Sequence, residues 1–482
     1  MRDPSTTPLE RLDPAEAWAP WEPNSGDPWG RKWAGHLYRR AAFGASWIEL
    51  ESAIAAGPES AIARLLEGGP GHEDFDRVMD ALAPEPARVP AVEGFDGPLQ
   101  GWWLHRIVRT PHPLREKLCL FWHDHFATSV HKVRRADLMA RQNLLIREHA
   151  LGKFGPLLRA MGRDPAMLIW LDSNSNVKDK PNENYARELM ELFALGVGHY
   201  SEGDVREAAR AFTGWHTDGK RFAFDASRHD DGPKVVLGRS GPFDGDDVVR
   251  IVLEEPAAAR FLARKLYRAF VSEAESPPER LIQPLADRYA ASGYDTGELI
   301  GTLLRSRLFF SDHAFRQRVK GPVEYVVGLL RGLEGTPAEE RANPGMQPQP
   351  QGSPLARLMD GLGQTLFAPP NVKGWPGGEA WLNSATLLAR HNLAWKVVQG
   401  GHGPSGMKAS PSALARKYRV GRDAEAQVGF LLDALLQPGE GEVDAPRRRK
   451  LAEYLSAAGS FGDDRLRETA HAVLLMPEYQ LA

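Results

Sequence analysis

Residues 171–196 read LDSNSNVKDKPNENYARELMELFALG, and this stretch decides the fold class. Tyr185, Leu189 and Phe193 recur at helical spacing, which predicts an amphipathic helix over 183–195. The same apolar spacing continues outward in both directions along the chain. It predicts further helices at 47–66, 99–109, 114–126, 134–149, 156–161, 246–254, 257–271, 277–292, 296–306, 313–333, 384–398, 411–418, 423–436, 444–457 and 464–476. The sequence therefore predicts a mainly α protein with a large multi-helix body.

One segment departs from the helical pattern. Within 219–239, the apolar runs RFAF and KVVL flank the turn-rich DASRHDDGP, which predicts a small β-hairpin insert. The 47 Gly and 37 Pro residues interrupt regular elements, so we expect long irregular loops, in particular at 68–98 and 366–383. Ser201 and Asp204 have the spacing of a capping box, which predicts that a helix begins directly after Ser201.

The composition along the chain predicts four parts. Residues 1–33 are rich in Pro, Trp and Asp and are expected to form an extended arm on the body. Residues 34–333 form the helical core with the β insert, and 334–354 form a linker or mobile loop because Pro, Gly and Gln dominate there. Residues 355–482 are expected to form a C-terminal helical part that packs on the core.

Charge and composition exclude several classes of protein. Lys and Arg number 60 against 63 Asp and Glu, a net charge of −3, which gives no basic footprint for nucleic acid. No apolar run approaches the length of a membrane span. Cys119 is the single cysteine, which excludes an internal disulfide. The N-terminal residues lack the pattern of a signal peptide, so we expect a cytoplasmic protein, although export together with a partner stays open.

The first candidate site is FWHDHFATS at 121–129. If the preceding helix continues through it, His123 and His125 point in different directions and cannot bind one ion. His125 then shares the apolar side of the helix with Leu118 and Trp122 and is the more buried histidine. If the helix ends at Trp122 and HDH is extended, both imidazoles lie on one face and could bind a metal or orient a carboxylate.

The second candidate resembles a calcium loop. Four oxygen-bearing side chains occupy positions 1, 3, 5 and 12 of such a loop: Asp172, Asn174, Asn176 and Glu183. Val177 stands where the loop needs glycine, and Lys178 and Lys180 add positive charge. The alternative is that Asp172 and the asparagines fold a turn and that Asn182 caps the next helix.

Glu188 is the third candidate, on the boundary between the polar and apolar faces of the predicted helix. Asn184 and Glu191 share its polar side, whereas Arg187 points elsewhere. A half-buried carboxyl there would have a raised pKa, which suits a ligand or a general acid/base. The alternative is one half of a buried salt bridge.

Two loops complete the set of candidates. His229 and Lys234, with Asp230 and Asp231, lie on the predicted hairpin turn and could line a pocket, or the turn could simply be solvated. Asp246, just beyond, is expected to cap a helix. The proline- and glycine-rich segment 366–392 presents side chains suited to polar-ring ligands, or it packs as a clamp on the N-terminal arm. These side chains are Asn371, Lys373, Trp375, Trp381 and Asn383.

Several long motifs together resemble one family, the bacterial domain of unknown function 1800 family. They are HLYRRAAFGAS (36–46), FWHDHFATS (121–129), DPAMLIWLD (164–172), NENYARELMELFALGVGHYSEGDV (182–205), AFTGW (211–215), HDDGPKVVLG (229–238), ARKLYRAFV (263–271), APPNVKGWPGG (368–378) and WLNS (381–384). The resemblance extends over nearly the whole chain. It implies an association with a sulfatase-like companion family, domain of unknown function 1501, beside which such proteins are often encoded.

These observations lead to two functional hypotheses. In the first, the protein is an enzyme of hydrolytic type whose cleft is built from His123, His125, Asp172, Glu183 and Glu188. These groups hold one divalent metal, calcium or zinc, or act as an acid/base cluster. Arg187, Lys234 and the Trp-rich loop would bind a sugar-like or anionic substrate. In the second, the protein is a non-catalytic binding partner of the sulfatase-like companion.

Overall fold

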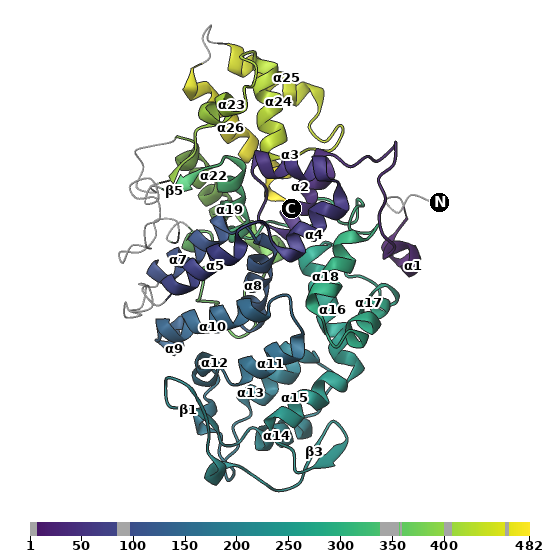
Figure 1. Cartoon of the computed structure of the whole chain (residues 1–482), viewed down its shortest axis with the longest axis vertical. Coiled ribbons are helices and arrows are strands. Elements are labelled where there is room, and N and C mark those ends of the chain that lie inside the picture. Colours follow the sequence, from purple (N-terminus) through teal and green to yellow (C-terminus); the bar gives the residue numbers. More distant parts are fainter. Residues whose placement is uncertain (1–6, 84–96, 338–355, 357–358, 400–406, 458–461) are drawn as a thin grey trace.

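The computed structural model describes residues 7–83, 97–337, 356, 359–399, 407–457 and 462–482. It is mainly helical, as the apolar spacing predicts (Figure 1). The first half contains α1 (Pro14–Ala17), α2 (Arg31–Ala41), α3 (Trp47–Ala56), α4 (Pro58–Glu67), α5 (His72–Leu82), α7 (Gly97–Arg109), α8 (Pro113–His125), α9 (Val130–Val133), α10 (Ala136–His149), α11 (Phe154–Gly162), α12 (Pro165–Trp170), α13 (Asn184–Glu188) and α14 (Glu202–Ala211). Within the described residues, no helix is both long and apolar enough to cross a membrane.

The second half is also built from helices. They are α15 (Gly245–Glu254), α16 (Pro256–Phe270), α17 (Glu279–Ala291), α18 (Thr296–Arg305), α19 (Pro322–Gly332), α22 (Ser384–Val398), α23 (Pro411–Lys417), α24 (Ala424–Leu435), α25 (Ala445–Ser456), α26 (Asp463–Leu474) and α27 (Pro477–Gln480). In Figure 1, α23 to α26 form one end of the molecule, and α14, α15 and the hairpin strands β1 and β3 form the other. Helix α8 lies between the two ends.

The predicted β insert consists of two hairpins instead of one. Strand β1 (Trp215–Thr217) pairs with β2 (Phe222–Phe224), and β3 (Lys234–Val236) pairs with β4 (Arg239–Gly241), both antiparallel. A further pairing joins β5 (Thr336–Pro337) to β6 (Met407–Lys408). Residues 225–233, predicted to be the turn of one hairpin, connect the two hairpins.

Several local details of the secondary structure differ from the expectations. The helix expected over 313–333 begins only at Pro322, as α19. Residues 72–82, expected to be loop, form α5, because Phe75, Met79 and Leu82 do keep helical spacing. Gly57 adopts a φ of 85° before Pro58, so the helix expected over 47–66 is two helices, α3 and α4. Asp244, and not Asp246, caps α15.

The expected cap at Ser201 is present: its hydroxyl accepts from the Asp204 amide, and the Asp204 carboxylate accepts from the Ser201 amide. The helix expected over 183–195 begins as α13 and continues as a π-helical segment, Leu189–Ala194. Single π-helical turns inside helices often lie at functional sites.

The described part of the N-terminal segment lies along the helical body. The indole of Trp18 donates to the Leu281 carbonyl, and the indole of Trp29 donates to the Ala53 carbonyl. Trp21 packs on Phe310, with ring centroids 4.5 Å apart. The segment predicted as a linker, 334–354, is described only as far as Pro337, and the remainder lies outside the described residues.

The centre of the fold is a buried carboxylate on α8. Glu116 is fully buried, and its oxygens accept from Trp103 Nε1 at 3.0 Å, Arg106 Nε at 2.9 Å and Arg147 Nη2 at 3.0 Å. Burial alone would raise the pKa of Glu116, but the two guanidinium groups outweigh it and hold the pKa at about 2. This carboxylate therefore joins α7, α8 and α10.

Replacing Glu116 by Gln leaves Arg147 buried without its counter-charge, whereas Arg106 keeps its ion pairs with Asp76 and Asp80. We expect Glu116→Gln to lower the free energy of unfolding by about 3–5 kcal/mol in a denaturant titration. The pKa of Glu116 is lowered on folding, so its stabilising contribution is complete above the ordinary value of 4.5 and is lost as the pH falls toward 2.

The matched control is Glu59→Gln. Glu59 also accepts from an arginine, Arg305, but its side chain is 68% exposed. An exposed pair of this kind contributes less than about 1 kcal/mol. Equal losses in the two variants would show that Glu116 does not organise the core.

Candidate functional site

Helix α8 continues through the HDH motif, which settles the choice between the two histidine arrangements. The His123 Nε2 accepts from the Phe367 amide at 3.2 Å, whereas His125 Nε2 lies 3.0 Å from the Phe193 carbonyl. The two imidazoles thus contact different segments, and they do not share a ligand position. Their exposed fractions are 1% and 3%, so the expected difference in burial between them is absent.

His125 is held between a lysine and a carbonyl. Lys265 Nζ, from α16, lies 2.9 Å from His125 Nδ1. An ammonium group can only donate, so Nδ1 accepts and the opposite nitrogen, Nε2, donates to Phe193. Burial first, and the Lys265 charge second, keep the pKa of His125 well below its ordinary value, and the ring is neutral. The Phe193 carbonyl is available because it lies in the last turn of the π-helical segment.

Asp124 and Lys265 form the ionisable centre of this region. Burial raises the pKa of Asp124 to about 6, although the Trp375 amide, which donates to its Oδ1 at 2.7 Å, acts in the opposite direction. Burial lowers the pKa of Lys265 to about 8, against the effect of the Asp124 charge. Within the described residues the two groups do not form an ion pair, so each feels the other's charge without direct contact.

The loop 366–383 closes over this centre. Gly374 adopts a φ of 82°, and a Cβ there would overlap the Asp124 carboxylate. The next residue, Trp375, is 8% exposed and packs beside His123, with ring centroids 5.7 Å apart. Trp375 and Trp381 belong to one small apolar cluster. The loop therefore clamps the end of α8, and little of the Trp375 ring is open to a ligand.

Glu188 is the last residue of α13, five residues before Phe193, whose carbonyl accepts from His125. It is half-buried, and burial and the neighbouring Glu191 raise its pKa, whereas Arg187 and Lys373 lower it. The charge of Lys373 thus reaches Glu188 from loop 366–383. Within the described residues Glu188 forms no ion pair, so the salt-bridge alternative finds no partner for it.

The remaining candidates are engaged in bonds that stabilise their own segments. Asp172 pairs with Lys132 at 2.8 Å, and Glu183 pairs with Arg187 at 2.9 Å. Arg187 also pairs with Glu202. Where the structure is described, no group of three or more His, Cys, Asp or Glu side chains is arranged to hold a metal ion.

The asparagines of the proposed calcium loop also hold backbone. The Asn174 side chain exchanges two hydrogen bonds with the backbone of Thr217 in β1. Asn176 donates to the Ala209 carbonyl and accepts from the Asn182 amide. Asn182 in turn accepts from the Asn184 amide at the start of α13. These bonds are those of the turn alternative, and they leave the calcium hypothesis without structural support.

The hairpin candidates fold their own loop. His229 Nδ1 lies 2.8 Å from the Thr213 carbonyl, and Lys234 Nζ donates to the Gly232 carbonyl at 3.0 Å. In the second loop, Asn371 accepts from the Lys373 amide, and Asn383 caps α22. Lys373 itself is exposed. Of these residues, Lys373 is the one whose charge lowers the pKa of Glu188.

The two central groups, Asp124 and Lys265, were not selected from the sequence. Asp124 lies inside the quoted HDH motif, between the two histidines that drew attention. Lys265 follows Leu262 by three residues and Ala258 by seven, so it lies on the apolar stripe of α16. A lysine on such a stripe is a detectable signal, because it must be buried, paired or functional.

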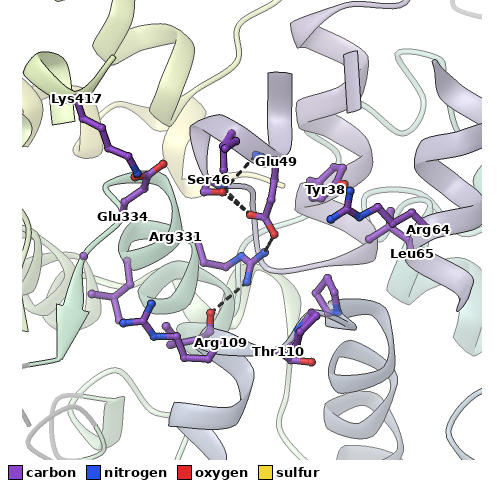
Figure 2. Close-up of a pocket in the computed structure, with 16 residues that line it drawn as sticks. Tyr38, Ser46, Glu49, Arg64, Leu65, Arg109, Thr110, Arg331, Glu334 and Lys417 are labelled. Atoms are coloured by element: carbon purple, nitrogen blue, oxygen red, sulfur yellow. Dashed lines mark hydrogen bonds and ion pairs between the residues drawn. The ribbon is translucent and has the colours of Figure 1, made fainter. Parts of the chain in front are cut away.

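A separate cavity of about 540 Å³ lies where α2, α3, α4, α7 and α19 meet (Figure 2). Figure 2 shows Glu49 beside Arg331 and Glu334 beside Lys417. Both carboxylates form ion pairs: Glu49 with Arg331 at 2.6 Å, and Glu334 with Lys417 at 2.5 Å. None of the site residues predicted from the sequence lines this cavity, and its carboxylates are neutralised, which suits binding better than proton transfer.

Replacement of Glu188 distinguishes its two hypothetical roles. Because Glu188 has no ion-pair partner and its pKa is raised, Glu188→Gln should change the free energy of unfolding by less than about 1 kcal/mol at neutral pH. The measurement is a denaturant titration beside Glu116→Gln. A loss of 3–5 kcal/mol, about that of a broken buried pair, would contradict the arrangement described.

The lowered pKa of Lys265 predicts a pH-dependent stability. Below about pH 8 the buried ammonium costs free energy, and the cost is relieved as the pH rises from about 8 toward the ordinary 10.5. We therefore expect the stability of wild type relative to Lys265→Met to increase over that interval. Unfolding titrations of both proteins at pH 7, 8, 9 and 10 measure it, and a constant difference would contradict the assignment.

The profile of the family described as a protein of unknown function, DUF1800, matches residues 36–481. Neither the curated proteins nor the solved structures contain a significant match. The matched region includes α8, α13, α16 and loop 366–383, so the whole candidate centre lies within it. The chain belongs to the DUF1800 family.

Proposed function

We propose that the protein is an acid–base enzyme of the hydrolytic class, with Asp124 and Lys265 as the groups that transfer protons. One observation carries this proposal. A carboxyl and an amine lie in the same partly desolvated region, and burial moves the two pKa values toward neutrality, to about 6 and about 8. Opposed shifts of this kind are typical of acid/base pairs in active sites.

The absence of an ion pair between them supports separate roles. Above pH 6 the Asp124 carboxylate accepts a proton from a water molecule, whose oxygen attacks the electrophilic atom of the substrate. The bond to the leaving group breaks, and the leaving group takes a proton from the Lys265 ammonium, which persists below about pH 8. Proton transfer from Asp124 back to Lys265, through solvent, restores both groups.

His125 is a positioning residue in this scheme. Its neutral ring accepts from Lys265 at 2.9 Å and is itself fixed by the Phe193 carbonyl. Trp375 fixes Asp124 in the same manner, through its backbone amide. Both proton-transfer groups are thus held by neutral partners, which restrain their position without neutralising their charge.

The substrate would be polar and anionic. Lys373 is exposed on loop 366–383, whose Trp375 amide holds Asp124, and it offers a cation there. Glu188 and Glu191 precede Phe193, whose carbonyl holds His125, and their carboxylates suit hydrogen bonds from sugar hydroxyls. We propose the acid–base version over the metal version because it needs only the groups that the described structure brings together.

The non-catalytic alternative, a partner of a sulfatase-like companion, would be favoured by a large exposed apolar patch. The large apolar side chains that are exposed in the described structure come from different elements, among them Ile48 of α3, Val78 of α5 and Leu388 of α22. They do not by themselves define such a patch, and the enzyme proposal is preferred.

A panel of chromogenic esters, glycosides, phosphoesters and sulfate esters tests the proposal. We expect hydrolysis of at least one class with a bell-shaped pH dependence of kcat/KM, rising near pH 6 and falling near pH 8. Asp124→Asn and Lys265→Met should each lower turnover by about 10²-fold or more while the protein stays folded.

Asp164→Asn is the matched control for Asp124→Asn. Burial also raises the pKa of Asp164 to about 6, but its carboxylate caps α12 and accepts from Gln142. Asparagine caps helices equally well, so this variant should keep full activity. Activity that survives Asp124→Asn, or that is lost equally in Asp164→Asn, would contradict the proposal.

A further inference from the structure

A second unusual region lies at a small cavity between α2, α19 and the C-terminal segment. Its volume is about 20 Å³, enough for about one water-sized particle and too small for an organic molecule. The lining combines apolar groups with five polar side chains, those of Arg39, Lys320, Glu324, Gln437 and Tyr479.

Arg39 presents an unused edge of its guanidinium group. Its Nη1 donates to the Leu436 carbonyl at 3.0 Å and to Gln437 Oε1 at 2.7 Å. Its Nε and Nη2 are buried and have no hydrogen-bond partner. These two nitrogens carry the pair of N–H groups with which arginine binds anions side-on. A buried donor pair without an acceptor is costly, so the site needs one.

Two further groups at the cavity lack an acceptor or a counter-charge. Lys320 is buried and has no ion-pair partner in the described residues, and its Nζ lies 3.7 Å from the centroid of the Tyr479 ring. The hydroxyl of Tyr479 is buried and forms no hydrogen bond. Both groups can donate to an anion in the cavity.

The neighbouring carboxylates are already neutralised. Glu324, which also lines the cavity, pairs with both Lys117 and Arg318. Glu442 pairs with Arg316 at 2.7 Å. The charges of Arg39 and Lys320 are therefore left uncompensated in a buried place. Burial first, and the Arg39 charge second, lower the pKa of Lys320 well below its ordinary value, which reflects the same excess of positive charge.

We propose that this cavity binds a monovalent inorganic anion of the chloride type, held by the Nε/Nη2 edge of Arg39 with Lys320 and the Tyr479 hydroxyl. The volume selects a single-atom anion over phosphate or a carboxylate-bearing metabolite. Such an anion satisfies the orphan donors and supplies the missing negative charge in one step. The site is independent of the proposed catalytic centre.

Thermal unfolding of the full chain in sodium chloride and in sodium gluconate, at equal ionic strength, tests the proposal. Chloride should raise Tm in a saturable manner, because an anion that binds only the native state stabilises it, whereas gluconate is too large for the cavity. Crystals grown in sodium bromide should show an anomalous peak between Arg39 and Tyr479. Electron density at this position without an anomalous signal would show a bound water molecule instead of an anion, and it would overturn the proposal.

Two variants connect the two measurements. Lys320→Met and Tyr479→Phe should each weaken the chloride dependence of Tm, Lys320→Met by about tenfold or more in affinity, since a charge-assisted bond is lost. Tyr325→Phe is the matched control, because it removes a buried hydroxyl from a ring 5.5 Å from Tyr479 that does not line the cavity. It should keep the wild-type dependence.

The remaining outcomes also decide the matter. A bromide peak without chloride-specific stabilisation would mean binding at crystal concentration only, and it would overturn the proposal. Chloride-specific stabilisation that is unchanged in Tyr479→Phe and Lys320→Met would place the anion elsewhere and would overturn it as well.

Discussion

The buried carboxylate of Glu116 is the constraint on which the arrangement of the other elements depends. A fully buried charge is tolerated only where ionised or polar donors surround it. Arg106 on α7 and Arg147 on α10 must therefore reach the same point on α8. Once α8 is fixed at this end, its other end is fixed too. Nine residues at 1.5 Å per residue place His125 about 13 Å further along the axis.

The same helix connects the candidate centre to the cation-rich region. Lys117, next to Glu116, pairs with Glu324 of α19, and Glu324 also pairs with Arg318. The C-terminal segment is attached to residues 318–320, which precede α19. The Lys320 amide donates to the Gln480 carbonyl, and the Ala482 amide donates to the Arg318 carbonyl. Helix α8 thus contacts three parts of the molecule. Glu116 joins the core helices, Lys117 pairs with Glu324 near the C-terminal segment, and Asp124 belongs to the proposed proton-transfer centre.

The sequence predicts the helical fold well and the site only in part, for a physical reason. Helical spacing and the Ser201 cap are local, so they can be found from neighbouring residues. The bond between His125 and Lys265 joins residues 140 positions apart, and the one between Asp124 and Trp375 joins residues 251 apart. No local pattern reports such contacts. The spacing of Asp172, Asn174 and Asn176 fits both a calcium loop and a turn, because turns use the same residues. Only the bonds of Asn174 and Asn176 to the backbone of β1 and α14 show what these two side chains hold.

Two carboxylates of α8 differ in the groups that surround them. The pKa of Glu116 is held at about 2 by two guanidinium groups, so its charge stabilises the fold at neutral pH. The pKa of Asp124 is raised to about 6, a shift of about two units, and ionising it in place costs about 3 kcal/mol. Lys265, which contacts His125, has a pKa lowered to about 8, and charging it in place costs a similar free energy.

A fold that only needed stability could have closed an ion pair between Asp124 and Lys265, as it does between Glu116 and Arg147. Instead the imidazole of His125 and the amide of Trp375, both neutral, hold the two groups. Neutral partners keep a buried acid and a buried base available for exchange near neutral pH, whereas an ion pair would fix both in the charged form. In the proposed function, this cost in stability accompanies two protons that stay exchangeable near neutral pH.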